Sequence, residues 1–466
     1  MSLSLLERPA AQVLLDDAEL HPATVRACQE RLTPFLQRYL PLFYRIEQRE
    51  HARVVIEGKL SGLERKTSEP IARRAGQERK PIQVFVGAGG WDDEAVTREL
   101  RVDVGAALGD ADGILIVDGS AFVKKGEDSC GVKRQWCGRL GKVENCQVGV
   151  FLAYATRHGH APLDRQLFLP EDWANDAARR AQCHVPDTVV FQEKWRIAQA
   201  LIERSGQDVP HRWVVADDEF GRVSVWRAWL RQQRKLYVLD VPSNTLVREV
   251  GVRRAAGGRP KFETAQAWAA RQPKRRWKTI RIRDGEKGPL RVQALDARVQ
   301  TKDEDGCAGP LERLLVTRTL AAKPDYAYHL SNAKHVPLQK VVRVGSERHR
   351  VEEVLQEGKG EVGLSHYEVR SWVGWHHHMT LSLLALWFLV LEQRRVGKKN
   401  TGHHDPASAA GIHEVAAESA ADASVHRRRN HQGAATHGGG PDLPLLQGNQ
   451  AFSAASPSRN PRSGKC

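Results

Sequence analysis

Three acidic residues occupy positions from which their carboxylates can act together. Asp118 ends the apolar run "ILIVD" and Asp217 ends "WVVAD", and both runs predict buried strands. A third acid lies in the charged helical segment "SERHRVEEVLQEGKGEVGLSHYEVRSW". Carboxylates crowded at one sheet edge repel each other unless cations lie between them. The pattern therefore indicates two Mg²⁺ ions that activate water for phosphodiester hydrolysis, whereas a turn-forming role for Asp118 is the alternative.

Helical spacing selects the third acid. Arg348, Glu352 and Lys359 are separated by four and then seven residues, which places them on one face of a helix. Glu353 projects about 100° away from that face. A metal-binding carboxylate beside Arg and Lys suits a phosphate substrate. The competing interpretation is an ordinary i,i+4 salt bridge between Arg348 and Glu352.

The elements that must position these acids predict an α/β fold. "ILIVD", "CQVGVFLAYAT" and "WVVAD" are expected strands, a polar loop is expected after Thr156, and "KWRIAQALIERSG" is an expected helix. This order favours a mixed sheet with flanking helices. The apolar run at 381–391 has 11 residues, about half of a membrane span, and predicts a buried helix.

Two basic regions flank this part of the chain. The first hundred residues predict short helices with cationic faces, which suit either DNA contact or a solvated helical cap. Between 235 and 343 the pattern becomes β-like, and residues 253–291 hold 13 Lys or Arg against three acids. Because Trp268 and Trp277 lie within that segment, phosphate contacts combined with base stacking are expected. From about 397 onward the composition is too poor in aromatic residues for a core, which predicts a disordered tail.

Composition narrows the class of protein. The 466-residue chain has a formal charge of +15 and a pI near 9.6, which points to a polyanionic partner. Seven cysteines without a CxxC pair fit a reducing cytoplasm, and no signal peptide or membrane span is expected.

Several sequence blocks resemble bacterial insertion-sequence transposases of the DDE superfamily, in the group with a β-rich insertion before the last acid. The blocks are Arg-x₃-Glu-x₆-Lys at 348–359, "DGSAFVKKG", "GVKRQWCGRLGKVENCQVGVFLAYAT", "WVVADDEFGR" and "GLSHYEVRSWVGWHHHMTLSLLALWFL". They occur in the family order over roughly residues 25–395. The signature normally opens with Tyr three residues before the Arg, where this chain has Gly345.

The resemblance implies an RNase H-like mixed sheet with flanking helices, interrupted by a β-rich insertion and preceded by a helical N-terminal domain. The expected division is a DNA-binding domain at 1–105, core at 106–234, basic insertion at 235–343, core with the Glu-bearing helix at 344–396 and tail at 397–466. Asp118, Asp217 and Glu352 match the catalytic, metal-binding triad, served by two Mg²⁺ ions that Mn²⁺ can replace. Expected DNA contacts are Lys124, Lys125, Arg348, Lys359, Trp268, Trp277, Arg275, Arg276 and Arg370. For Arg370 a plain surface role is equally open, and His376–His378 are expected to pack or to contact phosphate.

The implied function is a cytoplasmic bacterial DNA transposase. It would bind the terminal inverted repeats of its element as a dimer, cleave the ends and join them to target DNA. An inactive or domesticated DNA-binding regulator is the alternative. A general nuclease is a third reading, and it predicts cutting of unrelated duplexes.

Overall fold

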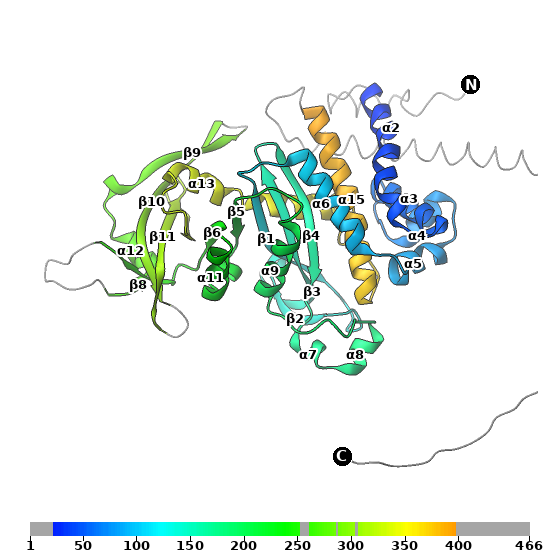
Figure 1. Cartoon of the computed structure of the whole chain (residues 1–466), viewed down its shortest axis with the longest axis horizontal. Coiled ribbons are helices and arrows are strands. Elements are labelled where there is room, and N and C mark those ends of the chain that lie inside the picture. The colour runs from blue at the N-terminus through cyan, green and yellow to red at the C-terminus, as the bar shows by residue number, and fades with distance from the viewer. Residues whose placement is uncertain (1–21, 252–260, 286–287, 303–305, 398–466) are drawn as a thin grey trace, which may run out of the picture. The chain divides into compact units, whose positions relative to one another are not determined.

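The computed structural model describes residues 22–251, 261–285, 288–302 and 306–397 (Figure 1). The predicted disordered tail, apart from its first residue, lies outside the described residues. Among the described residues no helix has the length and apolar character needed to cross a bilayer.

The core sheet has the strand order β4-β3-β1-β5-β6. β3 is antiparallel to both β4 and β1, whereas β1, β5 and β6 run parallel to one another. Three antiparallel strands followed by two strands parallel to the first is the RNase H-like arrangement, so the predicted fold class is confirmed. The bounds are β1 (Ile114–Val123), β2 (Lys133–Cys137), β3 (Lys142–Thr156), β4 (Gly159–Leu167), β5 (Trp213–Ala216) and β6 (Leu236–Asp240), with β2 pairing with the start of β3.

Two local expectations about these strands were wrong. Asp118 does not end its strand, because β1 continues to Val123 through pairing with β3. The polar loop expected after Thr156 is instead a turn followed by β4, which pairs antiparallel with β3. β4 looked polar because it carries Asp164 and Arg165, whose charges are buried against each other and against neighbouring helices.

A long buried helix holds the N-terminal helices against the core. α15 (Trp372–Gly397) packs on β4 and is contacted by α2, α3, α5 and α6 (Figure 1). Residues 381–390 are buried and Leu391 is partly buried, which confirms the predicted buried helix. The N-terminal helices are α2 (Pro22–Tyr39), η2 (Leu40–Leu42), α3 (Ile46–Lys59), α4 (Ser68–Ala75), α5 (Arg79–Ala88) and α6 (Asp93–Leu108).

The remaining helices lie on or beside the sheet. α9 packs on β3 and β4, whereas α14 packs on β1, β3 and β4, so β1 is covered by the helix that carries Glu352. The bounds are η3 (Gly138–Leu140), α7 (Glu171–Ala174), α8 (Ala177–Gln182), α9 (Lys194–Ser205), α10 (Asp218–Gly221), α11 (Ser224–Gln232), α13 (Leu338–Ser346) and α14 (His349–Gly360).

The β-rich segment extends the core sheet and does not stand apart from it. Its strand β12 pairs antiparallel with β6, so one hydrogen-bonded sheet runs through both parts. The segment also has its own apolar core around Trp268, Val299 and Leu314. Its elements are β7 (Leu246–Glu249), β8 (Glu263–Thr264), α12 (Ala265–Ala270), η4 (Lys274–Arg276), β9 (Lys278–Gly285), β10 (Gly288–Lys302), β11 (Ala308–Arg318) and β12 (Tyr326–Ser331).

The expected boundary at 235 falls just before β6, and β6 pairs in parallel with core strand β5. Strand 236–240 is therefore part of the core sheet. The division into domains otherwise stays a prediction.

Candidate active site

Asp118 and Asp217 lie side by side just after the stretch over which the neighbouring strands β1 and β5 pair in parallel. Val117 of β1 is in register with Ala216 of β5, and each aspartate is the next residue along its chain. Neighbouring strands are about 4.8 Å apart, so the two side chains share one edge of the sheet. Asp217 also caps α10, since its Oδ1 accepts a hydrogen bond from the backbone N–H of Glu219 at 3.0 Å.

The surroundings disfavour the ionised form of both acids. Burial and the neighbouring charge of Asp217 raise the pKa of Asp118 to about 7. Burial, together with Glu219 and Asp218, raises the pKa of Asp217 to about 6. Two carboxyl groups in this condition form a place where an added cation would be favoured.

α14 brings a guanidinium to the same edge. Arg348 Nε lies 3.0 Å from Asp240 Oδ2, and its Nη1 lies 2.7 Å from Glu352 Oε1. Burial acts to lower the pKa of Arg348, but the carboxylates of Asp240, Glu352, Asp118 and Asp217 outweigh it and raise that pKa. Arg348 is therefore ion-paired with Asp240 and Glu352 and lies within the electrostatic influence of Asp118 and Asp217.

The far end of α14 contacts β1. Lys359 Nζ donates to Ser120 Oγ at 2.8 Å and lies 5.3 Å from the centre of the Phe122 ring. Arg348 at the start of the helix and Lys359 near its end thus both contact the core sheet.

Glu352 is placed differently from the two aspartates. It lies on α14 with 53% of its side chain exposed, and it forms the i,i+4 ion pair with Arg348 that sequence spacing offered as the alternative. As the side chains lie, no three His, Cys, Asp or Glu residues within the described part of the chain form a metal-binding group. The structure therefore brings together two of the three predicted ligands, and the third is paired with Arg348 beside them.

The donor chemistry still suits a hard divalent cation. Asp118 and Asp217 offer only carboxylate oxygens, which Mg²⁺ prefers. Burial and neighbouring carboxylates raise their pKa values, and a bound cation would oppose both effects.

Sequence reasoning missed Asp240. It follows Leu239 of β6, which is in register with Ala216 of β5. Asp118, Asp217 and Asp240 therefore occupy equivalent positions on three adjacent parallel strands. His329 Nδ1 lies 2.6 Å from Asp240 Oδ1. The available signal was the run "LYVLD", a third apolar strand ending in an acid, like those before Asp118 and Asp217.

Two glycines fit close approaches around Asp240 and β6. A Cβ on Gly221 would come within 1.9 Å of the Asp240 carbonyl oxygen, so α10 can sit on the end of β6 only with glycine there. A Cβ on Gly345 would come within 2.9 Å of Val238 Cγ1. The tyrosine usual at the Gly345 position would not fit this packing of α13 on β6.

The lysines and arginine expected near the acids have mixed surroundings. Lys124 is turned inward, because its Nζ lies 3.4 Å above the Tyr367 ring, and burial lowers its pKa to about 8. Lys125 is exposed. Arg370 is exposed and paired with Asp128 at 2.9 Å.

The two tryptophans are not surface stacking platforms, and that expectation is corrected. Trp268 is fully buried, and its Nε1 donates to Glu249 at 2.8 Å. Trp277 is 9% exposed and lies under the guanidinium of Arg318 at 4.0 Å. Both serve the core of the β-rich segment, so neither offers a free ring face to a base.

Of the two arginines beside them, Arg275 is exposed, whereas Arg276 is partly buried. Arg276 donates to Gln272 Oε1 at 2.6 Å and to the Asp296 carbonyl oxygen at 3.2 Å.

The three consecutive histidines pack and do not contact the surface. His376, His377 and His378 are buried, and each has a ring nitrogen 2.9–3.2 Å from a backbone carbonyl oxygen. Burial lowers the pKa of all three, to about 4 for His376, so they are neutral at pH 7. Packing is confirmed and phosphate contact is not supported.

Sequence reasoning also missed the position of β9 beside α14. Arg283 Nη1 lies 2.7 Å from His349 Nε2, and Arg343 of α13 donates to the Arg281 carbonyl oxygen at 3.2 Å. The exposed basic side chains of β9 are Lys278, Arg281 and Arg283. Only the fold reveals that this basic strand reaches the helix that carries Glu352.

An RNase H-like sheet with adjacent, partly buried aspartates on two neighbouring parallel strands defines a class of nucleases, and sequence comparison agrees. Residues 38–289 match the family described as DDE superfamily endonuclease, which is more than half of the chain. The chain belongs to the DDE superfamily endonuclease family. The matched region includes Asp118 and Asp217 and ends before α14.

Two further similarities are narrower. A probable transposase for insertion sequence element IS701 from Microchaete diplosiphon is 34% identical over 118 residues, which cover 25% of this chain and 31% of that protein. The structure of the piggyBac transposase synaptic complex with hairpin DNA covers 83% of this chain at 9% identity. The match covers 73% of the piggyBac chain with a TM-score of 0.40, which is a weak likeness.

Proposed function

We propose that the protein is a DNA transposase, which binds the terminal inverted repeats of an insertion sequence, cleaves the DNA ends and joins them to target DNA. It would act in the bacterial cytoplasm, and two copies would serve the two ends. The observation that carries the proposal is the adjacent, partly buried pair Asp118 and Asp217 in a chain of the DDE superfamily endonuclease family.

In this proposal Asp118, Asp217 and Glu352 hold two Mg²⁺ ions, which Mn²⁺ can replace. Bound there, the metal would supply an activated water and a counter-charge for the leaving oxygen. Arg348 and Lys359 would orient a DNA phosphate beside the acids, since both already contact the same sheet edge from α14. When DNA binds, a phosphate would pair with the Arg348 guanidinium, and the Glu352 carboxylate released from that ion pair would bind a metal ion.

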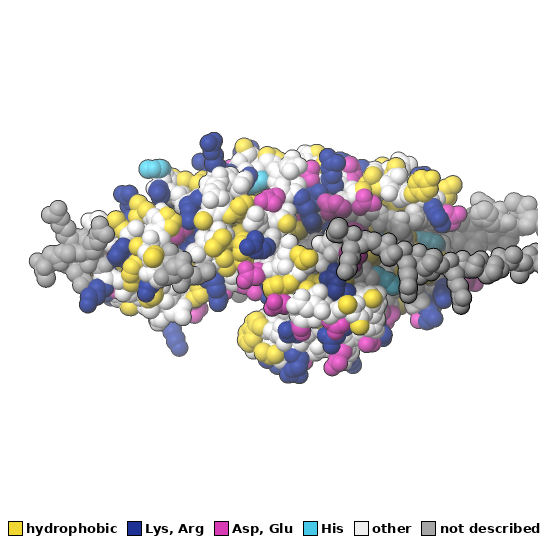
Figure 2. Space-filling model, turned by 60° about the horizontal axis from the view of Figure 1, so that its bottom comes forward, with side chains coloured by type: hydrophobic (Ala, Val, Ile, Leu, Met, Phe, Trp, Pro, Cys, Tyr) yellow, Lys and Arg dark blue, Asp and Glu magenta, His cyan; other side chains and the backbone are white. Residues whose placement is uncertain are grey.

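The basic β-rich segment supports a DNA partner. Arg281 of β9 and Arg291 of β10 are paired directly across the two strands, and both are exposed. Like charges opposite each other destabilise a sheet, and a phosphate between them would reverse that effect. On the face seen in Figure 2, Lys and Arg side chains are spread over the whole surface and are not gathered into one band.

The test is a cleavage assay with a duplex that carries the flanks of the protein's own gene. With Mg²⁺ the wild-type protein should cut at the end of the element, and EDTA should stop the reaction. Asp118→Asn, Asp217→Asn and Glu352→Gln should each lower cutting by more than about a hundredfold, because even outer-shell metal partners cost about 10–100-fold.

Matched controls lie next to the proposed ligands. Asp218→Asn removes a carboxylate that pairs with Arg222, and Glu353→Gln removes one that pairs with Arg350. Both variants should keep cutting. Full activity of Asp118→Asn, or equal cutting of an unrelated duplex, would reject the proposal.

A second candidate is a DNA-binding regulator without catalysis. Two observations favour it. The carboxylate of Glu352, the third acid, is paired with Arg348, and the described residues contain no metal-binding group of three His, Cys, Asp or Glu residues. Specific binding of the end duplex without any metal-dependent cutting would select this candidate.

A further inference from the structure

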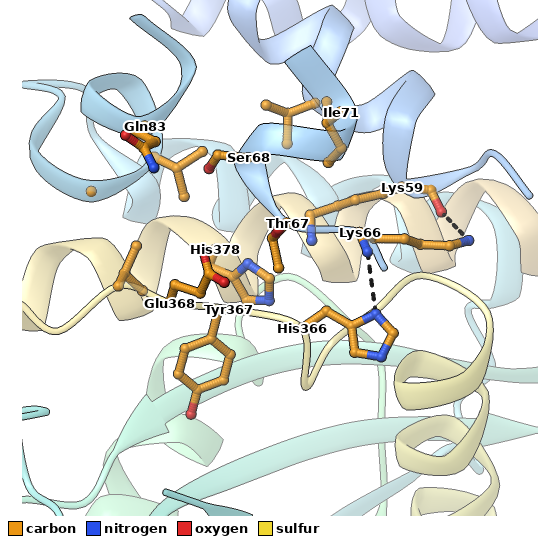
Figure 3. A pocket seen from close by; sticks show the side chains of 14 residues that line it. Lys59, Lys66, Thr67, Ser68, Ile71, Gln83, His366, Tyr367, Glu368 and His378 are labelled. Carbon is orange, nitrogen blue, oxygen red and sulfur yellow. Dashed lines mark hydrogen bonds between the residues drawn. The ribbon is translucent and has the colours of Figure 1, made fainter. Parts of the chain in front are cut away.

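A pocket of about 230 Å³ lies between the N-terminal helices and the segment that precedes α15 (Figure 3). Its wall is formed by α3, α4 and α5 on one side, and by residues 366–369 with His378 of α15 on the other. This volume is several times the roughly 30 Å³ of a water molecule and below the range of about 300–1,000 Å³ typical of drug-sized ligands. None of the three acids at the sheet edge lines it.

An unpartnered ammonium is directed into this pocket. Lys59, the last residue of α3, is 1% exposed, and its Nζ has no hydrogen-bond partner among the described residues. Figure 3 shows its side chain reaching toward Thr67, with the amine end among the lining residues. Burial and the nearby charge of Lys66 lower the pKa of Lys59 to about 7. A buried amine without a partner is costly, and an anion in the pocket would remove that cost.

The second lysine of the pocket is already occupied. Lys66 Nζ donates to the carbonyl oxygens of Lys59 and Glu361, and its backbone N–H donates to His366 Nδ1 at 3.3 Å. Lys66 thus fixes the chain around the pocket, whereas the Lys59 amine is left to meet a ligand.

A helix begins at the same place. α4 starts at Ser68 with Thr67 as its N-cap, and the Thr67 side chain makes no capping hydrogen bond. Both residues line the pocket. The first N–H groups of a helix lack intrahelical partners and carry partial positive charge, which favours an anion. Lys59 is the second, independent observation that points to the same ligand.

The other charged groups leave the pocket electropositive. Glu368 is the acidic residue in the lining, but its side chain is 58% exposed and lies 3.4 Å from Arg65. Burial, then Lys59, lowers the pKa of both His366 and His378, so both imidazoles are neutral at pH 7. Lys124 adds a positive charge from beneath the Tyr367 segment.

We propose that this pocket binds a phosphoryl group through the Lys59 ammonium, the Thr67 and Ser68 hydroxyls and the start of α4, and that a DNA strand supplies the phosphate. The choice of DNA as the source rests on the proposed function, whereas phosphate binding itself does not. α14 connects the two places, because Arg348 at its start contacts the acids and Glu361 just past its end accepts from Lys66. Twelve helical residues span about 18 Å, so a strand running along α14 would reach both.

The first experiment measures the melting temperature of the full chain in inorganic phosphate and in chloride at matched ionic strength. Phosphate should raise the melting temperature of the wild type by about 2 °C or more, since a ligand that binds only the folded state stabilises it. Lys59→Met should lose this shift. Lys80→Met, an equal charge loss at an exposed position of α5, should keep it. No shift in the wild type, or an equal shift in Lys59→Met, would overturn the proposal.

If Lys59→Met does not fold, Thr67→Val replaces it, because valine keeps the shape and removes the hydroxyl. Phosphate should then shift the melting temperature of Thr67→Val less than that of the wild type, and an equal shift would count against the site.

The second experiment identifies the source of the phosphate. With the end duplex, Lys59→Met should bind about tenfold more weakly than Lys80→Met and should show a salt slope reduced by about one. Equal affinity of the two variants would mean that the pocket takes free phosphate, and the DNA part of the proposal would be wrong. Neither measurement needs cutting, so Asp118→Asn should show the same phosphate-induced shift in melting temperature and the same DNA affinity as the wild type. The result for the pocket therefore stays interpretable even if the cleavage assay fails.

Discussion

At the scale of single residues, the protein holds several acidic side chains close together, which lowers the stability of the folded state. Asp118 and Asp217 are partly buried neighbours with raised pKa values, and Arg348 forms ion pairs with Asp240 and Glu352. Such an arrangement is less stable in the folded protein than separated, hydrated carboxylates would be. It is typical of a site organised for a ligand and not for stability.

This cost predicts a stability change. The pKa of Asp118 is raised to about 7 from an unfolded value of about 3.9, so the folded state binds the extra proton and stability falls as pH rises from about 4 through 7. In EDTA at pH 8, Asp118→Asn should therefore melt at a higher temperature than the wild type. Mg²⁺ should raise the melting temperature of the wild type and have little effect on Asp118→Asn. Asp218→Asn is the control, and an unchanged Mg²⁺ response in Asp118→Asn would contradict the prediction.

The sequence predicted the two aspartates because each follows an apolar run of a parallel strand, and such ends meet at one edge. It missed Asp240 because the run "KLYVLDV" was assigned to the insertion, and only the β5–β6 pairing moves it into the core. Trp268 was misassigned because composition shows aromatic residues among basic ones but does not show which of them are buried.

At the scale of elements, a buried ionic network joins α6, β4 and α9. Asp164 of β4 is fully buried and accepts hydrogen bonds from Arg101 of α6, from Arg204 and Ser205 of α9, and from its neighbour Arg165. Arg165 in turn contacts Thr380 of α15. The network links the helical layer to the edge strand β4, which β3 separates from β1.

Removing its central carboxylate should be strongly destabilising. Burial opposes ionisation of Asp164, but Arg204, Arg165 and Arg101 outweigh it and hold its pKa well below the usual range. Asp164→Asn should lower the free energy of unfolding by about 3–5 kcal/mol at pH 7, because it leaves buried arginines without a counter-charge. Urea denaturation measures this loss.

The pH dependence follows from the sign of the shift. A depressed folded pKa gives stability that is present above about pH 4 and lost as pH falls further. The difference in the free energy of unfolding between the wild type and Asp164→Asn should therefore become smaller below pH 4. The exposed Asp187→Asn variant should match the wild type, and an equal gap at pH 7 and pH 3 would show that the charge of Asp164 is not responsible.

The network also explains why β4 escaped sequence reasoning. A strand is recognised by apolar alternation, and Asp164 and Arg165 broke that pattern in a segment whose charged side chains form ion pairs inside the protein. The amphipathic α9 and the apolar α15, in contrast, follow directly from their periodicity or length.

At the scale of the whole molecule, the formal charge of +15 dominates the expected behaviour toward DNA. Affinity for the end duplex should fall steeply with salt, by about 10³–10⁵ between 50 and 200 mM if 6–10 phosphates are contacted. Arg291→Thr should reduce the salt slope by about one. It should also stabilise the DNA-free protein by about 0.2–1 kcal/mol, because it relieves the Arg281–Arg291 cross-strand repulsion.

Binding titrations at several salt concentrations, together with melting curves, check both parts. Arg276→Gln is the contrasting variant, since the partly buried Arg276 side chain is hydrogen-bonded to Gln272 and the Asp296 carbonyl. Its salt slope should stay unchanged while its melting temperature falls. A reversed ranking of the two variants would show that DNA does not run along β9 and β10.

The net charge follows from the composition, and the sequence shows that much of the positive charge lies in the insertion. The sequence did not show that the insertion continues the core sheet, because strand pairing between β6 and β12 joins residues about ninety positions apart.

That continuity has a mechanical consequence. Since β12 is hydrogen-bonded to β6 and His329 Nδ1 lies 2.6 Å from Asp240 Oδ1 across this strand pair, a displacement of the insertion would be transmitted to Asp240. A tilt of the distant strands of the insertion would move the Asp240 side chain. It would also move the guanidinium of Arg348, which is ion-paired with both Asp240 and Glu352. Binding of a nucleic acid by the distant strands would then reposition the charged groups at the sheet edge in the same movement.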